Sequence, residues 1–169
     1  MKKAVSWFLI LLLLACCGTA LADGWQWTGK VWQYIRAGEP VKGEWLLDQG
    51  KWYYLDFLGE MLEDEFFYDA PPSVPGGPWY YLGTDGAMLS GGWKRVTETW
   101  EWADAWGNGH VDSYDFWIYA EASGRLACNQ WKLINGVWYY FHGYRMVTGE
   151  WTIGGETYTF DESGAWVGD

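Results

Sequence analysis

The residues of this chain whose types and spacing suggest a function are tryptophan and tyrosine, not polar catalytic groups. Their chemistry is that of binding through aromatic rings. The 169 residues include 16 Trp and 12 Tyr. Many of these rings fall in a signature of two or three aromatic residues and an apolar one, followed by glycine; the clearest copies are Trp52 to Leu55, Trp79 to Leu82 and Trp138 to Phe141. The negative face of an aromatic ring attracts cations, by ~0.5–2 kcal/mol per ring in a desolvated site. The same faces can stack on sugar rings.

Residues that could catalyse a reaction are scarce. The two histidines, His110 and His142, belong to no metal-binding or nucleophile motif. The acidic run Glu63 to Glu65 could in principle serve a glycosidase, but it lies in a charged connector where a solvated loop explains it. The sequence therefore predicts a protein that is not an enzyme and needs no cofactor.

One segment, Asp104 to Asp115, resembles the calcium loop of dockerin and EF-hand modules. Oxygen-bearing residues stand at loop positions 1, 5, 9 and 12, with glycine at position 6. Position 3, however, is Trp106, and the flanking residues have the pattern of strands. A hairpin turn explains the same residues, so we predict no metal site.

The elements that must carry the aromatic residues are short strands. Each copy has a leading tryptophan, a glycine turn, an aromatic strand and a second glycine turn, which is typical of β-hairpins. The spacing from a strand tryptophan to the next leading tryptophan is 13 or 14 residues. The pairs, strand tryptophan first, are Trp32 and Trp45, Trp79 and Trp93, Trp117 and Trp131, and Trp138 and Trp151. No helical periodicity is sustained after residue 23. We expect an all-β array of stacked hairpins, because such units cannot bury their apolar faces alone.

The predicted organisation is a signal peptide over residues 1–22 and a single repeat domain over residues 23–169, with about six units. Two insertions interrupt the period, near 69–78, which is rich in proline, and near 97–115, which has the pattern of a longer hairpin. Lys2 and Lys3, an apolar run and the small residues of Ala20-Leu21-Ala22 indicate export. A lipoprotein signal acylated at Cys16 is the alternative. Nothing later in the sequence is long and apolar enough to span a membrane.

Charge and cysteine content restrict the partners and the source of stability. Without Lys2 and Lys3 the chain has 9 basic and 22 acidic residues, and thus a formal charge of −13. Such a polyanion repels nucleic acid and favours cationic partners. Cys128 is the single cysteine left after the signal peptide, so no intrachain disulfide stabilises the domain.

The repeats resemble the choline-binding, or cell-wall-binding, repeats of exported proteins from Gram-positive bacteria and their phages, to which glucan-binding repeats are related. The matching motifs are Gly50 to Tyr54, Gly59-Glu60-Met61, Gly86-Ala87-Met88, Gly91-Gly92-Trp93, Gly136 to Tyr140 and Tyr144-Arg145-Met146. The resemblance covers essentially all of residues 24–168. It implies a left-handed β-solenoid of stacked hairpins with ligand sites between successive hairpins.

The resemblance also implies where the sites lie. Aromatic boxes are expected to form from Trp27, Trp32 and Tyr54; from Trp45, Trp52 and Tyr81; from Trp93, Trp117 and Tyr140; and from Trp131, Trp138 and the final copy. Met61, Met88 and Met146 are expected to close their floors. The last copy has Thr157 in place of the strand tryptophan and is expected to be a cap. The inward-facing Tyr53, Leu55, Tyr80, Leu82 and Tyr139 are expected to be core residues.

The function implied is a non-catalytic, secreted module, associated with the cell wall or cell surface, that recognises choline on teichoic or lipoteichoic acids. Three alternatives remain open at this point. The rings could bind a glucan or another polysaccharide, the protein could be a surface adhesin or structural subunit, or it could target a separately encoded hydrolase. Measured affinities for choline and for a glucan would distinguish these two ligands.

Overall fold

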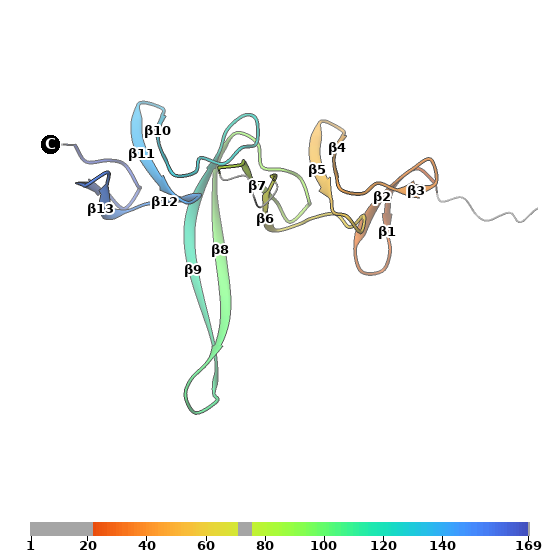
Figure 1. Cartoon of the computed structure of the whole chain (residues 1–169), viewed down its shortest axis with the longest axis horizontal. Helices are drawn as coiled ribbons and strands as arrows, with labels where there is room; N and C mark the ends of the chain where they lie inside the picture. The colour runs from red at the N-terminus through yellow and green to blue at the C-terminus, as the bar shows by residue number, and fades with distance from the viewer. Residues whose placement is uncertain (1–21, 71–75, 169) are drawn as a thin grey trace, which may run out of the picture.

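The structure is a computed structural model that describes residues 22–70 and 76–168. Cys16 and nearly all of the expected signal peptide lie outside these residues, as does the segment 71–75 of the proline-rich insertion. The described residues form fourteen strands and no helix, which confirms the all-β fold (Figure 1). Accordingly, the described part of the chain contains no helix able to cross a membrane.

Six antiparallel hairpins follow one another in a row (Figure 1). Unit 1 consists of β1 (Gly24–Trp27), β2 (Trp32–Arg36) and β3 (Glu39–Pro40); unit 2 of β4 (Glu44–Asp48) and β5 (Lys51–Leu55); unit 3 of β6 (Glu65–Tyr68) and β7 (Trp79–Leu82). Unit 4 consists of β8 (Gly92–Ala103) and β9 (Gly109–Ala120); unit 5 of β10 (Gln130–Ile134), β11 (Val137–His142) and β12 (Arg145–Met146); unit 6 of β13 (Gly149–Ile153) and β14 (Glu156–Phe160).

Two-residue turns set the register of three hairpins. In unit 5, Ile134 pairs with Val137 around Asn135 and Gly136, whose φ angles are 52° and 84°. Units 2 and 6 turn in the same way, with positive φ at both central residues. Such turns match the right-handed twist of the flanking strands, which is why Asn-Gly and Gly-Gly are favoured there.

An aspartate turn closes several of the units. Asp56 Oδ1 accepts hydrogen bonds from the backbone N–H groups of Leu58 and Glu60, both at 2.8 Å. Asp161 closes unit 6 with the same pattern. The side chain thus satisfies backbone donors that no strand reaches, as aspartate commonly does in turns.

Main-chain hydrogen bonds connect neighbouring units. The N–H of Met61 in the closing loop of unit 2 donates to the carbonyl of Trp32 in unit 1 at 2.8 Å, and Met88 donates to Trp52 at 2.7 Å. Leu126 and Trp166 repeat this contact with Trp79 and Trp138, both at 2.8 Å. The repeated link fixes units 2, 3, 4 and 6 against their predecessors, as expected for an array in which neighbours stabilise one another.

The core is a column of apolar side chains along the row. The residue three positions after the strand tryptophan, or after Thr157 in unit 6, is 0–2% exposed in every unit: Ile35, Leu55, Leu82, Ala120, Phe141 and Phe160. Burial of a side chain such as Leu contributes about 1.5–3 kcal/mol. Leu55 and Leu82 confirm the prediction of core positions. Tyr53, Tyr80 and Tyr139 are half-buried and also line open pockets between units. Tyr53 and Tyr139 pack against the core, so the prediction holds for them only in part.

Unit 4 differs from the others in length. Its strands have 12 residues each, paired without a break from Gly92 with Ala120 to Ala103 with Gly109, and the outer part projects away from the row as an arm (Figure 1). The tip, from Asp104 to Asn108, uses the aspartate turn of the unit-closing loops. We call residues 97–115 the arm.

Candidate functional site

Four open pockets of the same construction lie between successive hairpins. Their volumes, in chain order, are about 270, 340, 350 and 360 Å³. Pocket A is lined by Trp25, Trp32, Tyr53, Met61 and Asp85; pocket B by Trp45, Trp52, Asp69, Tyr80, Met88 and Ser123; pocket C by Trp93, Trp117, Tyr139, Met146 and Ser163; pocket D by Trp131, Trp138, Tyr158 and Trp166.

Each pocket takes its walls from two hairpins. One hairpin gives a leading tryptophan from its first strand and a strand tryptophan from its second. The following hairpin gives a tyrosine, whose ring lies 4.9 Å from the leading tryptophan at 66–72° in all four pockets. Edge-to-face contact is a favoured geometry for aromatic pairs. It holds three rings around an open space.

The strand tryptophans keep an open side toward solvent. Trp32, Trp52, Trp117 and Trp138 are 40%, 41%, 41% and 42% exposed, respectively. The same environment therefore recurs although the units differ in loop length and sequence. A half-exposed indole is available to a ligand and also gives a fluorescence signal that reports on one.

Methionines from the following unit line pockets A to C, where the sequence placed Met61, Met88 and Met146. Each methionine packs under a glycine one unit further along: Gly86, Gly124 and Gly164, respectively. A Cβ on any of these glycines would overlap the methionine side chain, and their φ angles of 72°, 86° and 80° also favour glycine. In pocket D, Trp166 takes the place of the methionine.

The tyrosine of each pocket differs from the predicted one by a single position. Tyr53, Tyr80 and Tyr139 line pockets, whereas Tyr54, Tyr81 and Tyr140 do not. Tyr54 and Tyr140 pair across the strands with the leading tryptophans Trp45 and Trp131, at ring distances of 5.3 and 5.4 Å. They support those indoles from within their own hairpins. Because neighbouring residues of a strand point to opposite faces, it is the preceding tyrosine that faces the previous unit.

Tyr81 has a further role that keeps it out of a pocket. It is 4% exposed, and its hydroxyl donates a 2.5 Å hydrogen bond to Asp64 Oδ1. Burial, followed by the neighbouring Asp64 carboxylate, raises the pKa of Tyr81 well above its usual range. Tyr81 therefore belongs to the core and anchors the charged connector.

The leading tryptophan of unit 1 also differs from the prediction. Trp25, not Trp27, lines pocket A. Trp25 pairs with Tyr34 as Trp45 pairs with Tyr54, whereas Trp27 pairs with Trp32 near the end of the hairpin, 5.6 Å away. A signal for this was present: Trp25 precedes Trp32 by seven residues, the spacing of Trp45 to Trp52 and of Trp131 to Trp138.

Between units 3 and 4 the equivalent positions hold Phe66, Trp79, Ile118 and Leu126. In place of an open pocket there is a packed cluster, and the ring of Tyr144 from unit 5 stacks on Phe66 at 4.1 Å and lies 5.4 Å from Trp79. Trp79 is accordingly less exposed than the four other strand tryptophans. Tyr144 thus fills the space that stays open in pockets A to D.

Carboxylates distinguish pockets A and B from C and D. Asp85 lines pocket A, and a hydrogen bond from Lys51 at 2.9 Å is the main cause of its lowered pKa. Asp69 lines pocket B and accepts a 3.0 Å hydrogen bond from Trp45 Nε1. Burial and, after it, Asp69 raise the pKa of Tyr80, against an opposing effect of Arg125. The tyrosine of this pocket therefore stays a neutral ring near a negative charge. The sequence analysis missed both aspartates, because they come from loops.

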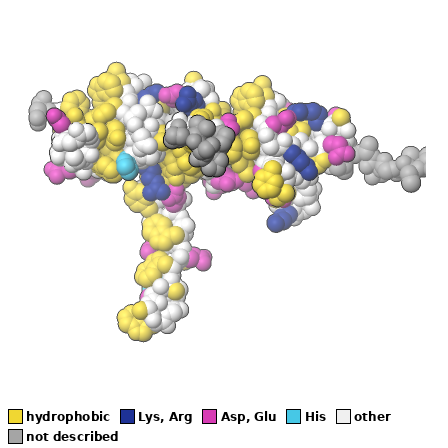
Figure 2. Space-filling model, in the orientation of Figure 1, with side chains coloured by type: hydrophobic (Ala, Val, Ile, Leu, Met, Phe, Trp, Pro, Cys, Tyr) yellow, Lys and Arg dark blue, Asp and Glu magenta, His cyan; other side chains and the backbone are white. Residues whose placement is uncertain are grey.

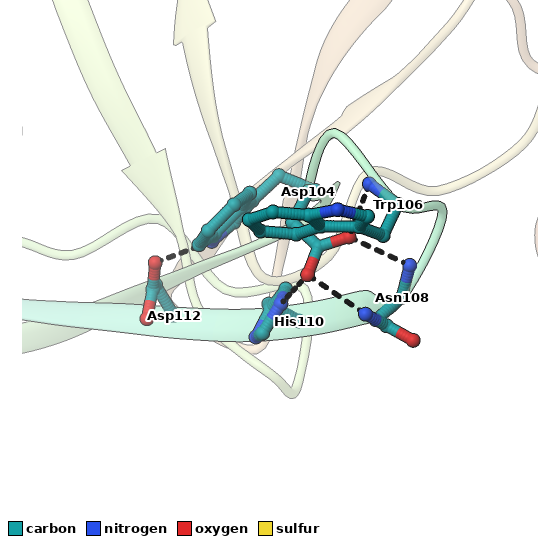
Figure 3. Close-up of polar contacts among 6 residues, drawn as sticks. Asp104, Trp106, Asn108, His110 and Asp112 are labelled. Atoms are coloured by element: carbon teal, nitrogen blue, oxygen red, sulfur yellow. Dashed lines mark hydrogen bonds and ion pairs between the residues drawn. The ribbon is translucent and has the colours of Figure 1, made fainter.

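The loop that resembles a calcium site has its oxygens engaged by the protein itself. Asp104 Oδ1 accepts N–H bonds from Trp106 and Asn108 at 2.9 Å, and Oδ2 faces Asn108 Nδ2 at 2.9 Å and His110 Nε2 at 3.3 Å (Figure 3). These hydrogen bonds, chiefly those from Asn108, lower the pKa of Asp104 to about 2. In residues 22–70 and 76–168 no group of three His, Cys, Asp or Glu side chains is placed to hold a metal ion.

The sequence matches the family described as "Putative cell wall binding repeat" over residues 43–61, 76–88 and 129–142. These segments contain the strands of unit 2, the second strand of unit 3 and the strands of unit 5 up to His142. A comparison with curated proteins finds no match.

Solved structures of similar proteins come from Streptococcus pneumoniae and its phage. Choline binding protein F from Streptococcus pneumoniae is 30% identical, with 86% of this chain and 52% of that chain covered and a TM-score of 0.37. The modular Cpl-1 endolysin, complexed with a peptidoglycan analogue, is 25% identical, with 88% and 38% covered and a TM-score of 0.50. The pneumococcal cell wall endolysin from phage Cp-1, complexed with choline, is 24% identical, with 88% and 38% covered and a TM-score of 0.51.

The chain spans about half or less of the length of these relatives. The repeat matches fall on the hairpins that build the pockets, and the fold is shared with the endolysins. The chain belongs to the family of choline-binding, or cell-wall-binding, repeat proteins.

Proposed function

We propose that pockets A to D bind choline groups on teichoic or lipoteichoic acids of a bacterial cell wall, and that the protein binds without catalysing a reaction. The observation that carries this proposal is the fourfold recurrence of a half-open space walled by two tryptophans and a tyrosine. A quaternary ammonium cannot donate hydrogen bonds, so rings are the groups that bind it well. The methionine floor adds a soft, polarisable contact for its methyl groups.

The pocket linings favour a quaternary ammonium over a sugar ring. A sugar carries hydroxyl groups that lose hydrogen bonds to water unless the site supplies partners. Pocket D offers only Trp131, Trp138, Tyr158 and Trp166, and the single short polar side chain in pocket C is Ser163. In pockets A and B the added polar groups include carboxylates, which attract a cation.

Attachment to a wall polymer would rest on several weak sites acting together. Four pockets on one chain can engage a polymer that displays many choline groups, and the second and later contacts then form at high effective concentration. The formal charge of −13 that the chain has without residues 1–22 also favours cationic groups over anionic surfaces. With residues 1–22 as an export signal, we infer a secreted protein held at the cell wall or cell surface.

A choline titration followed by tryptophan fluorescence and calorimetry tests the proposal. We expect saturable binding with up to four sites and a rise in the thermal midpoint, because a ligand of the native state stabilises it by mass action. Ethanolamine, which keeps its N–H donors, is expected to bind more weakly. Trp52→Ala is expected to remove one site, whereas Trp106→Ala, at a tip residue that is 86% exposed and outside the pockets, should leave the number unchanged.

A soluble glucan oligosaccharide is the matched ligand for the rival function. Unchanged fluorescence and melting at high millimolar choline, together with a response to the glucan that Trp52→Ala weakens, would assign the pockets to sugar. A response to neither ligand would favour the structural or adhesin interpretation.

A further inference from the structure

The arm has a structure that pocket formation does not require. Its outer strands have no neighbouring unit, since the arm projects from the row of hairpins (Figure 2). Units 2 and 5 supply both tryptophans of pockets B and D from strands of only five or six residues. The additional pairs of unit 4, from Thr97 with Asp115 to Ala103 with Gly109, therefore extend beyond any pocket.

The two faces of the arm are different. Residues that alternate along the strands place Trp100, Trp102 and Tyr114 on one face, together with Asp112 and His110. The three large rings are 49%, 44% and 50% exposed. The opposite face carries small, polar or aliphatic residues: Thr99, Glu101, Val111 and Ser113. We call the first of these surfaces the aromatic face of the arm.

The aromatic face is held in place by its own contacts. The Trp102 ring stacks on His110 at a centroid distance of 4.3 Å, and its Nε1 donates to Asp112 Oδ2 at 2.5 Å. His110 in turn contacts Asp104 of the tip (Figure 3). Rings fixed in this way lose little conformational entropy when a partner binds.

The arm is strongly acidic. Residues 97–115 contain five acidic residues and no lysine or arginine, a formal charge of −5 with histidine neutral. Rings combined with carboxylates favour a cation, and the charge disfavours an anionic lipid surface or a second copy of this acidic chain.

A cation already sits on the same face where the arm joins the row. The guanidinium carbon of Arg145 lies 4.5 Å from the Phe116 ring centroid and 5.9 Å from that of Tyr114, and Arg145 forms an ion pair with Glu98. Phe116 and Glu98 share the face of Tyr114 and Trp100. The molecule therefore shows how this face accommodates a guanidinium: rings below it and a carboxylate beside it.

Further out, the same chemistry is repeated without a cation of the protein. Trp100 pairs with Asp112 across the strands, and Trp102 lies beside it. Among the described residues, the cation–π contacts of this face belong to Arg145 alone. Trp100 and Trp102 are two positions apart, about 7 Å, which is the spacing of alternate side chains in an extended peptide.

We propose that the aromatic face of the arm binds an extended basic segment of a partner protein, with arginine or lysine at alternate positions over Trp100 and Trp102. A flat ribbon face lacks the three walls that enclose a small quaternary ammonium in pockets A to D. It suits an extended chain, which can also pair with the free backbone edge of a two-stranded ribbon. This proposal does not depend on the ligand of the pockets.

The test is binding of a fluorescein-labelled peptide, Gly-Arg-Gly-Arg-Gly-Arg-Gly, to the full chain by fluorescence anisotropy at low salt. Saturable binding is expected, and it should weaken as salt rises, because exposed charges are screened. Asp112→Asn, Trp102→Ser and Trp100→Ala are each expected to weaken binding about three- to tenfold. The matched controls Glu101→Gln and Val111→Ser, on the opposite face, should change it less than twofold.

Four results would overturn the proposal. Equal losses in Glu101→Gln and Asp112→Asn would indicate attraction by net charge alone. Displacement of the peptide by choline, or loss of binding in Trp138→Ala, would place it in the pockets. If this face bound phosphatidylcholine vesicles or a glucan oligosaccharide but did not bind the peptide, its partner would be a lipid surface or a polysaccharide and not a basic protein segment. A dimer in sedimentation that Trp102→Ser dissociates would identify a second copy as the occupant.

Discussion

At the scale of single residues, adjacent tyrosines have separate tasks. Tyr139 contributes a wall to pocket C, whereas Tyr140 lies behind Trp131 in the same hairpin as that tryptophan. The distinction follows from strand alternation, since Tyr139 faces the preceding unit and Tyr140 the following one. The double-tyrosine strands of units 2 and 5 therefore each serve two pockets, one directly and one through the indole that the second tyrosine supports.

Replacement of Tyr139 by alanine tests this division. Tyr139→Ala should remove one choline site and lower the free energy of unfolding by about 1–3 kcal/mol, because a half-buried ring and its edge contact with Trp93 are lost. Calorimetric titration and urea unfolding measure the two effects. Tyr139→Phe keeps the ring and should keep every site. Retention of all sites in Tyr139→Ala would mean that this ring is not part of the binding surface.

The residues that could be predicted from the sequence are those that repeat in register. The strand tryptophans Trp32, Trp52, Trp117 and Trp138 and the floor methionines were found because each keeps its place relative to a glycine turn. The choice between Tyr53 and Tyr54 was missed because both faces of each hairpin are covered, so apolar residues do not mark one inner side. Asp85 and Tyr144 reach their sites from units further along the chain, and Asp69 reaches pocket B from the loop inside unit 3. No local pattern in the sequence carries that information.

At the scale of elements, glycines in the closing loops determine how closely one unit approaches the next. Gly124 in the loop after β9 lies over Met88 of the preceding unit, where a Cβ has no room. Gly136, in the turn between β10 and β11, has a similar φ of 84° but has nothing within 4 Å of the Cβ position. A side chain at either position would therefore strain the backbone, but only a side chain at Gly124 would also clash with a neighbouring residue.

The stabilities of the two variants Gly124→Ala and Gly136→Ala can be compared to test this difference. Each substitution should cost about 1–2 kcal/mol for the left-handed backbone. Gly124→Ala should cost about 1–3 kcal/mol more, because Met88 must move, and it should also weaken pocket B. Thermal unfolding and choline titration of the two variants give the comparison. Equal stability losses with four intact sites in both would show that Met88 yields without effect on the pocket.

At the scale of the whole molecule, the row of hairpins ends in a unit that completes a pocket without starting another. Unit 6 supplies Tyr158 and Trp166 to pocket D but has Thr157 in place of a strand tryptophan. Such terminal units are expected in arrays whose stability is the sum of units and interfaces. Unit 6 therefore contributes to one pocket and lacks the strand tryptophan that a further pocket of this kind would need.

Ending the chain at Thr148 removes unit 6. The truncated protein should lose the site at pocket D and self-associate, because Trp131 and Trp138 lose their cover, while units 1 to 4 stay folded. Sedimentation velocity reports association, and hydrogen exchange reports which units remain protected. Unfolding of the entire chain in one step would instead indicate a single cooperative core.

The packing of Tyr144 against Phe66 and Trp79 has a mechanical consequence. A ligand bound in pockets A to D, as we propose, would contact two or three successive units and act as a clasp that resists their separation when the protein is pulled along its length. The junction between units 3 and 4 lacks such a pocket and has its clasp built in, as a side chain that cannot dissociate. Under load, the protein without ligand should therefore yield first at a junction that Tyr144 does not span, and the saturated protein should carry the load evenly along its length.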